Sequence, residues 1–467
     1  MRIIKPTILK RLSFLIILSC TVTAQDFNLK NISQQKQLPL TPQKSSAQVN
    51  IHESNWKLTS NDINHFINAN QTITIKNFPS AAIELDNKTS PRTIIFKKYD
   101  VFAKNAKIYL VTSKGRKELQ RPKLITYSSI ANGLSLVVNP TNGEAHGYYN
   151  KAGVSLDIIG NIHTSLSIKQ HQEHTQNTDV TKQCFTKMDN QPEISSINLG
   201  NNAIQAPHAP TGTINYQAVI AVDTDNEWML GKSNNTTTAM TFITTLFTNM
   251  NVYYERDFAT RLLIGDTFLR TTTDPFPTEP NISTYLSDFG EYWRVNQGAI
   301  NRDFSLLLSG QNINSNSFSG IAWVNILCND GFQQGSQTPG SYSVNRMGSS
   351  LSVGFVSQFV GHELGHNFGS PHTHCYSTPI DHCYNGEAGC YSGPTSCPGG
   401  PGTKGTIMSY CHVGGASGAN CGISNENFHP TVITQITGRI AASSSPTCIV
   451  PFAPPGADTI FDNGFEN

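Results

Sequence analysis

Three histidines and one glutamate stand at short, regular spacing in the segment GHELGHNFGSPH, which runs from Gly361 to His372. His362 and His366 are four residues apart, so on a helix their imidazoles lie one above the other, at a separation that a single metal ion bridges. Gly369 tolerates a positive φ, which allows a sharp turn that brings His372 back as a third nitrogen ligand. Three histidines leave a fourth tetrahedral position open for water, and this favours a catalytic zinc site over a closed structural one.

Glu363 is placed to act as a general base. On a helical wheel with about 100° per residue, it falls between the histidine side and an apolar side formed by Val356, Val360, Leu364 and Phe368. Zinc lowers the pKa of a bound water to about 7, and a nearby carboxylate can take the proton as the oxygen attacks a peptide carbonyl. The alternative is an ordinary surface helix with polar residues. The added glycine and third histidine make a chance match roughly a thousandfold rarer, so we favour the metal site.

The elements that must position these residues alternate between strands and helices. Apolar runs predict strands at 218–222, 261–264, 304–308 and 320–327. Apolar residues at helical spacing predict helices within 236–254 and 286–293, besides the helix that carries the histidines. This alternation favours an α/β domain.

Composition and the N-terminus indicate where the protein works. The 467 residues carry 33 basic and 32 acidic side chains, so charge gives no footprint for nucleic acid or an anionic membrane. Basic residues, the apolar run 12–18 and the small-residue stretch Val22-Thr23-Ala24 predict a signal peptide over 1–24, too short for a transmembrane helix. A lipoprotein signal that acylates Cys20 is the alternative. We therefore expect a secreted protein, with a periplasmic or lipid-anchored location as alternatives.

The remaining chain divides by composition into four parts. Residues 25–166 read as a β-rich propeptide domain, and 167–213 as a polar linker with few apolar residues to fold around. Residues 214–450 form the expected catalytic domain, and 451–467 a C-terminal tail. The tail resembles a short C-terminal sequence on exported proteins of some Gram-negative bacteria.

Cysteine usage supports oxidising surroundings. Eight of the ten cysteines lie in the expected catalytic domain and can pair into four disulfides: Cys328, Cys375, Cys383, Cys390, Cys397, Cys411, Cys421 and Cys448. Cys20 leaves with the signal peptide, and Cys184 in the linker is left over.

The segment HELGHNFGSPH resembles the HExxHxxGxxH zinc signature of metzincin metalloproteases, and Gly405–Tyr410, GTIMSY, is similar to their Met-turn. The segments AVIAVDTD, VYYERDFATRLLIG, TDPF and GIAWVNILC are similar to the reprolysin or adamalysin branch, the ADAM-like proteases. The resemblance implies a mixed five-stranded sheet with helices, zinc in a cleft, and Met408 beneath the three histidines. It also implies a disulfide between Cys328 and Cys448, while the pairing of the other six cysteines stays open.

The resemblance assigns roles to two further segments and has one departure. The strand Gly320, Ile321, Ala322 and Trp323 would be the edge to which an extended peptide adds by main-chain hydrogen bonds. Tyr410 is similar to a tyrosine of astacins and serralysins that binds zinc or stabilises the oxyanion; packing under the site is the alternative. Reprolysins usually carry Asp directly after the third histidine, where this chain has Thr373. The spacing does not select the nearby His374 or His412.

Cys184 suggests how the protein is kept inactive before export. It stands before the expected catalytic domain, and a thiolate is a strong zinc ligand. We expect it to take the open zinc position in a proform, in the manner of the metzincin cysteine switch, until cleavage of the linker removes it. The flanking TKQCFTKMD does not match the matrix-metalloprotease switch motif closely, and an idle thiol is the alternative.

Two functions remain from different classes. The first is a secreted zinc metalloendopeptidase, made as a zymogen, that acts as a monomer on protein or peptide substrates. The second is a binding protein or adhesin that keeps the zinc and cleaves nothing. Glu363 favours the first, because a binding module has no use for a base beside the metal. Zinc storage would need several open sites, and the sequence has one. Calcium as an additional cofactor stays open.

Overall fold

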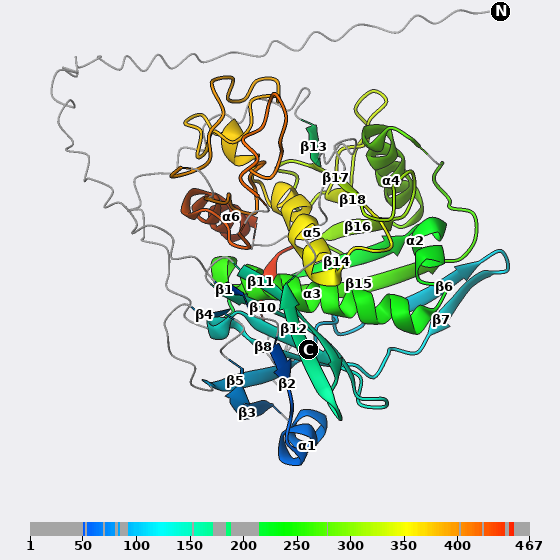
Figure 1. The fold of residues 1–467 in the computed structure, drawn as a ribbon. Helices are drawn as coiled ribbons and strands as arrows, with labels where there is room; N and C mark the ends of the chain where they lie inside the picture. The colour runs from blue at the N-terminus through cyan, green and yellow to red at the C-terminus, as the bar shows by residue number, and fades with distance from the viewer. Residues whose placement is uncertain are drawn as a thin grey trace, which may run out of the picture. The chain divides into compact units, whose positions relative to one another are not determined.

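A central mixed sheet organises the part of the chain that follows residue 214 (Figure 1). This part contributes β14 (Tyr216–Thr224), β15 (Thr260–Arg270), β16 (Phe304–Ser309), β17 (Phe318–Trp323) and β18 (Tyr342–Met347), in the spatial order β17-β18-β16-β14-β15. The neighbours are parallel except β17, which runs antiparallel to β18. The expected mixed α/β fold is confirmed.

The computed structural model describes residues 50–51, 54–68, 71–79, 83–84, 92–151, 154–170, 184–187, 214–277, 279–400, 403–422, 425–443 and 448–452. The expected signal peptide, including Cys20, lies outside these residues, as do most of the expected linker and the tail after Phe452. None of the described helices is long and apolar enough to cross a membrane.

Helices cover both faces of the central sheet. Neighbouring residues of β14 point to opposite faces, so Ile220 belongs to a core shared with α3 (Thr236–Phe258) and α5 (Val353–Asn367). Ala221 belongs to a second core shared with α4 (Ile282–Asn296). The helices begin at Thr236, Ile282 and Val353, because Asn235, Asn281 and Ser352 accept hydrogen bonds from the first free backbone N–H groups. The remaining elements of this part are α2 (Asn226–Gly231), a 3₁₀ turn (Thr373–Cys375), α6 (Pro430–Ser443) and β19 (Val450–Pro451).

A second sheet lies in residues 50–170, here called the N-terminal domain. Its eight strands are antiparallel to their neighbours in the order β2-β12-β11-β10-β9-β8-β5-β3. They are β2 (Ser54–Trp56), β3 (Thr72–Phe78), β5 (Arg92–Tyr99), β8 (Ile125–Ser129), β9 (Leu134–Val138), β10 (Glu144–Lys151), β11 (Val154–Asn161) and β12 (Ser165–Gln170). Helix α1 (Ser60–Asn68) packs on its core through Phe66, a short 3₁₀ turn (Ile130–Asn132) joins β8 to β9, and β1 (Asn50–Ile51) pairs with β4 (Ile83–Glu84).

The N-terminal domain also adds strands to the central sheet. The hairpin β6 (Ile108–Thr112) and β7 (Gly115–Leu119) extends it, because β6 pairs in parallel with β15. Val101, Phe102 and Ile108 belong to the same core as α3 and α5. At the opposite edge, β13 (Cys184–Lys187) pairs in parallel with β17. Strands from before residue 214 therefore lie at both edges of the sheet, and the expected domain boundaries stay predictions.

Two strands differ from the sequence-based expectation. β17 ends at Trp323, whereas the sequence predicts a strand to Leu327. The chain turns there because Asn325 adopts a left-handed φ of 60°, and its N–H donates to the carbonyl of His366. β18 is not predicted by the sequence, since its buried residues include Asn345 and Arg346. The Asn345 amide donates to Leu307 O, and Arg346 donates to the carbonyls of Glu279 and Pro280.

Candidate metal centre

Helix α5 carries the histidine motif through the interior between α3 and the Met-turn segment. Two helical glycines permit this close packing, because a Cβ on Gly361 would lie 2.1 Å from the Tyr253 hydroxyl oxygen. A Cβ on Gly365 would lie 2.6 Å from the sulfur of Met408. Glycine within a helix costs about 0.5–1 kcal/mol relative to alanine, and the close approach of both neighbours explains why it is used here.

The three predicted histidine ligands converge at one point. The Nε2 atom of His366 lies 3.0 Å from Nε2 of His362 and 3.2 Å from Nε2 of His372. Gly369 adopts a φ of 119°, so the turn that returns His372 to the helix uses the glycine as the sequence predicts. Among the described residues, these three histidines form a group whose nitrogen atoms all lie close enough to hold one metal ion.

The Nδ1 atom of each histidine forms a hydrogen bond with an oxygen atom. His362 donates through Nδ1 to Ile407 O at 2.6 Å, and His366 donates to Ser370 O at 2.7 Å. His372 donates through Nδ1 to the Glu387 carboxylate at 2.7 Å. A neutral imidazole that donates through Nδ1 presents a lone pair at Nε2. Three lone pairs therefore face one another, and a cation placed among them would make this arrangement favourable.

Burial and spacing agree with zinc. Desolvation by burial lowers the pKa of His362, His366 and His372, so the rings stay neutral, as metal ligands must be. Tetrahedral zinc with nitrogen ligands at about 2.0–2.1 Å requires ligand nitrogens about 3.3 Å apart. The observed separations are close to this value, so the residues fit a zinc ion.

Glu363 lies beside this cluster and in contact with the edge strand. Its side chain is fully buried. A Cβ on Gly320 of β17 would lie 2.3 Å from Glu363 Oε1, so the absence of a side chain at Gly320 makes room for the carboxylate. The predicted base and the predicted substrate strand are therefore neighbours.

The Met-turn segment packs against the helix and the turn that carry the three histidines. Met408 is buried beside Gly365, and the preceding Ile407 supplies the carbonyl that holds His362. Thr373, which stands where reprolysins usually carry Asp, donates through its backbone N–H and its hydroxyl to Met408 O. Tyr410 is buried, with its ring centroid 4.0 Å from that of His372. Its packing against the His372 ring is observed, and a direct role in the reaction stays a prediction.

The eight cysteines expected to pair form four disulfides. Cys328 pairs with Cys448, which is the pair that the resemblance implies. The six that the sequence leaves open pair as Cys375–Cys390, Cys383–Cys411 and Cys397–Cys421. These three bonds hold the Gly- and Pro-rich segment between the third histidine and the Met-turn.

Sequence reasoning missed two residues beside the three histidines, Glu387 and His374. Glu387 binds His372, and it also accepts a hydrogen bond from His374 Nε2 at 2.9 Å. The His374 ring stacks on His372 with centroids 5.3 Å apart. Glu387 stands in an irregular segment, and its return to His372 depends on disulfide pairing that the sequence leaves open. No local pattern could have identified it.

The remaining sequence-predicted site residue is Cys184. Its backbone lies in β13, paired in register with Gly320 of β17, and Lys187 pairs with Trp323. Strand β13 thus occupies the edge that the sequence assigns to a substrate, in parallel orientation.

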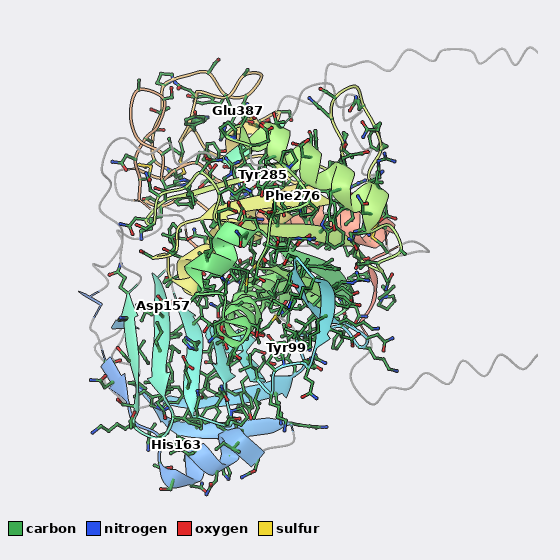
Figure 2. The ribbon with its side chains drawn as sticks, turned by 90° about the vertical axis from the view of Figure 1, so that its right-hand side faces the viewer. Tyr99, Asp157, His163, Phe276, Tyr285 and Glu387 are labelled. Atoms are coloured by element: carbon green, nitrogen blue, oxygen red, sulfur yellow. A yellow bond between two sulfur atoms is a disulfide. The ribbon has the colours of Figure 1, made fainter. Side chains whose placement is uncertain are left out.

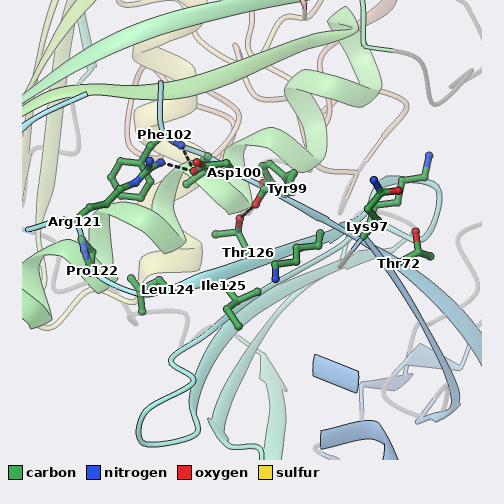
Figure 3. Close-up of a pocket in the computed structure, with 13 residues that line it drawn as sticks. Thr72, Lys97, Tyr99, Asp100, Phe102, Arg121, Pro122, Leu124, Ile125 and Thr126 are labelled. Carbon is green, nitrogen blue, oxygen red and sulfur yellow. Dashed lines mark hydrogen bonds and ion pairs between the residues drawn. The ribbon is translucent and has the colours of Figure 1, made fainter. Parts of the chain in front are cut away.

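A separate cavity of about 760 Å³ lies in the N-terminal domain (Figure 3). Its lining includes Lys97, Tyr99, Asp100 and Arg121, and Arg121 pairs with Asp100. The Arg121 guanidinium also lies 3.9 Å from the centre of the Phe102 ring. None of the histidine ligands lines this cavity, so it is distinct from the metal centre.

Comparison with known proteins relates residues 215–420 to a family of metallopeptidases. Residues 215–420 match the reprolysin model of metallo-peptidase family M12. The crystal structure of metalloproteinase-II from Bacteroides fragilis is similar at 9% identity and a TM-score of 0.37, covering 79% of this chain and 92% of that chain. A chaperone-substrate complex matches at 13% identity and a TM-score of 0.27, covering 66% of this chain and 40% of that chain. Curated protein sequences give no match. Residues 215–420 of this chain therefore form a reprolysin-like metallopeptidase domain.

Proposed function

We propose that the protein is a secreted zinc endopeptidase that is made as a latent zymogen and hydrolyses peptide bonds of extracellular proteins. The observation that carries the proposal is the convergence of three buried Nε2 atoms whose Nδ1 atoms all donate to oxygen. The match of residues 215–420 to a metallopeptidase family supports a hydrolase that acts on proteins.

His362, His366 and His372 would hold the zinc ion. When bound, zinc supplies a Lewis acid that polarises a carbonyl and lowers the pKa of water. The hydrogen bonds at Nδ1 fix each ring so that its Nε2 lone pair faces the site. Met408, buried beneath the motif helix, keeps this face of the site apolar.

Glu363 would move the proton. Its carboxylate accepts a proton from the attacking water and then passes one to the leaving amine. Contact between Glu363 and Gly320 supports this role, because a peptide added to β17 would bring its backbone past the carboxylate. Tyr410, packed against His372, is the proposed additional group that stabilises the oxyanion.

Latency would come from β13. A strand already paired with β17 excludes a substrate from the same edge. Cys184 pairs in register with Gly320, which itself contacts Glu363, so the cysteine backbone stands one strand spacing from the residue beside the proposed base. This placement supports the cysteine as an internal inhibitor, with cleavage in the linker removing it.

Metal analysis combined with hydrolysis assays of an unstructured protein tests the enzyme proposal. The mature parent is expected to hold one zinc ion per chain and to lose activity with a chelator. The His366→Ala variant should lose zinc, because one of three ligands is removed. Glu363→Ala should keep zinc and lose about 10²–10⁴-fold in activity, because the base is removed and no ligand is.

The control is Glu291→Ala, which removes a half-exposed glutamate of α4. Full zinc retention by His366→Ala would contradict the ligand assignment. Unchanged hydrolysis by Glu363→Ala would mean that another group is the base. Zinc binding by a parent that cleaves no protein would favour the binding-protein alternative.

A further inference from the structure

Glu387 accepts two hydrogen bonds on one oxygen atom. Its Oε2 lies 2.7 Å from His372 Nδ1 and 2.9 Å from His374 Nε2. We propose that Glu387 is a positioning residue, which fixes the ring orientation and tautomer of His372 and thereby strengthens metal binding at the three-histidine site. The inference rests on the proposed zinc site.

His372 differs from His362 and His366 in the group that accepts its Nδ1 hydrogen bond. His362 and His366 donate to neutral backbone carbonyls, whereas His372 donates to a carboxylate. A carboxylate bound to Nδ1 holds the proton there and makes Nε2 a stronger donor to a metal. Because His372 Nε2 lies 3.2 Å from His366 Nε2, the same contact aims the lone pair into the cluster.

A disulfide-closed loop carries Glu387 to this position. Cys375–Cys390 joins residues that are 15 apart in the sequence, and the backbone N–H of Tyr391 donates to His374 O at 3.0 Å. The loop therefore returns beside the third ligand, and Glu387 stands three residues before the returning cysteine. Its side chain is 17% exposed, so water has little access to compete for the hydrogen bonds. Figure 2 labels Glu387 among the loops at the top of the view.

His374 completes the arrangement. Its ring stacks on that of His372 at an interplanar angle of 10°, and both rings donate to the same oxygen. A half-buried carboxylate that accepts two N–H groups is well compensated for its loss of water. The His374 ring thus holds Glu387 in place, while Glu387 holds His372.

The alternative is a second metal site, since His372, His374, Cys375 and Glu387 lie close together. The sulfur of Cys375 is bonded to Cys390, so it offers no thiolate. The two imidazoles direct N–H groups at Glu387 and present no lone pair to a shared ion. The contacts therefore favour a hydrogen-bonded support of one ligand.

The test compares zinc affinity across variants of the full chain with its disulfides formed, by competition with a chelator of known affinity. Glu387→Ala is expected to bind zinc about 10- to 100-fold more weakly than the parent. Glu387→Gln keeps the size and one acceptor oxygen, so an intermediate loss is expected. The matched control is Glu144→Ala, which removes an exposed carboxylate that pairs with His146 in the N-terminal domain.

Two further measurements separate positioning from a general loosening of the loop. The absorption spectrum of the cobalt-substituted Glu387→Gln protein should differ from that of the parent, because the His372 ligand is altered. His374→Phe removes one of the two hydrogen bonds to Glu387 and leaves the Glu387–His372 contact, so it should weaken zinc binding less than Glu387→Ala does. If His374→Phe weakens zinc binding as much as Glu387→Ala, loop order is the cause and the inference is overturned.

The melting temperatures of the metal-free parent and Glu387→Gln are expected to agree, with a smaller rise on zinc addition in the variant. Should Glu387→Ala fail to fold, Glu387→Gln carries the test. If Glu387→Gln has the zinc affinity and the cobalt spectrum of the parent, the inference about Glu387 is overturned and the proposed zinc site is not affected. Absence of zinc binding in the parent would instead overturn the proposed function.

Discussion

At the residue scale, Gly320 is the position where one methyl group should decide activity. A Cβ there would lie 2.3 Å from Glu363 Oε1, and the buried carboxylate would have to shift. A displacement of about 1 Å can cost about 10²-fold in rate. We therefore expect Gly320→Ala to lower kcat by roughly that factor while zinc content stays at the parental level, measured by hydrolysis assays and metal analysis on the same samples.

The control for Gly320 is Gly438→Ala. No atom lies within contact distance of a Cβ at Gly438 in α6, so the added methyl should leave activity unchanged. Parental activity in Gly320→Ala would show that Glu363 has room to move, and that its contact with β17 does not set its position.

The residues of the candidate metal site differ in how far the sequence could predict them. His362, Glu363 and His366 share one helix, and His372 follows after a single glycine turn, so their geometry is local. Glu387 reaches His372 only through a loop whose course depends on the Cys375–Cys390 bond. A contact of that kind is set by long-range pairing, and no periodicity in the sequence signals it.

At the element scale, the residue directly before β16 carries a carboxyl group that should make stability depend on pH. Asp303 accepts a hydrogen bond from Val219 N at 2.6 Å, and burial raises its pKa to about 7. Because this pKa is above the unfolded value, its contribution to stability is fully present below about pH 4 and is lost as pH rises towards 7.

Asp303→Asn keeps an acceptor oxygen and cannot ionise. The variant should therefore gain melting temperature relative to the parent as pH rises, by an amount equivalent to roughly 1–4 kcal/mol at pH 8. Thermal unfolding between pH 5 and pH 8 measures the difference. Asp266→Asn, at an exposed group that also accepts from a backbone N–H, is the control. A constant difference across pH would contradict the assignment to Asp303.

The side chains of β14, β16 and β18 explain why the sequence predicts the first two strands and not the third. β14 and β16 are apolar runs, so their sequences favour buried strands. β18 includes Asn345 and Arg346, whose side chains are satisfied by carbonyls of neighbouring segments. Burial of such polar residues depends on tertiary hydrogen bonds, which an apolar pattern cannot reveal.

At the scale of the whole molecule, the pairing of β13 with β17 leads to a prediction about the proposed latency. Cys184→Ala in the uncleaved chain should raise proteolytic activity above that of the uncleaved parent, because the thiol proposed as the inhibitor is removed while β13 remains. Thr186→Ala in the same strand is the control. Equal latency in Cys184→Ala and parent would mean that strand pairing alone blocks the edge.

The sequence could suggest a β-rich N-terminal domain but not its place in the central sheet. The strand β6 pairs with β15 across more than 150 residues of chain, and each strand alone would fit many partners. Which strands pair is decided by how the side chains around both strands pack together in the folded protein. The contribution of Phe102 and Ile108 to the α3 core is therefore visible only in the structure.

This shared core predicts that cleavage of the linker does not release the N-terminal domain. Ser135 donates to Asn249 of α3 at 2.8 Å, Lys107 N donates to Asp266, and the Arg261 guanidinium lies over the Tyr99 ring. Burying Val101, Phe102 and Ile108 stabilises the contact by roughly 1.5–3 kcal/mol per side chain. Together with the β6–β15 hydrogen bonds, this offsets much of the roughly 4–15 kcal/mol that association of separate chains costs.

A specific protease site placed between residues 188 and 213 allows the test. After cleavage, both fragments of the parent should elute together in size-exclusion chromatography and separate on a denaturing gel. Phe102→Ala should weaken the complex, because it removes apolar contact with the shared core. Elution of the parental fragments as two separate species would contradict the prediction. Co-elution with full activity would mean that activation requires only the departure of β13, while the N-terminal domain stays as a permanent part of the enzyme.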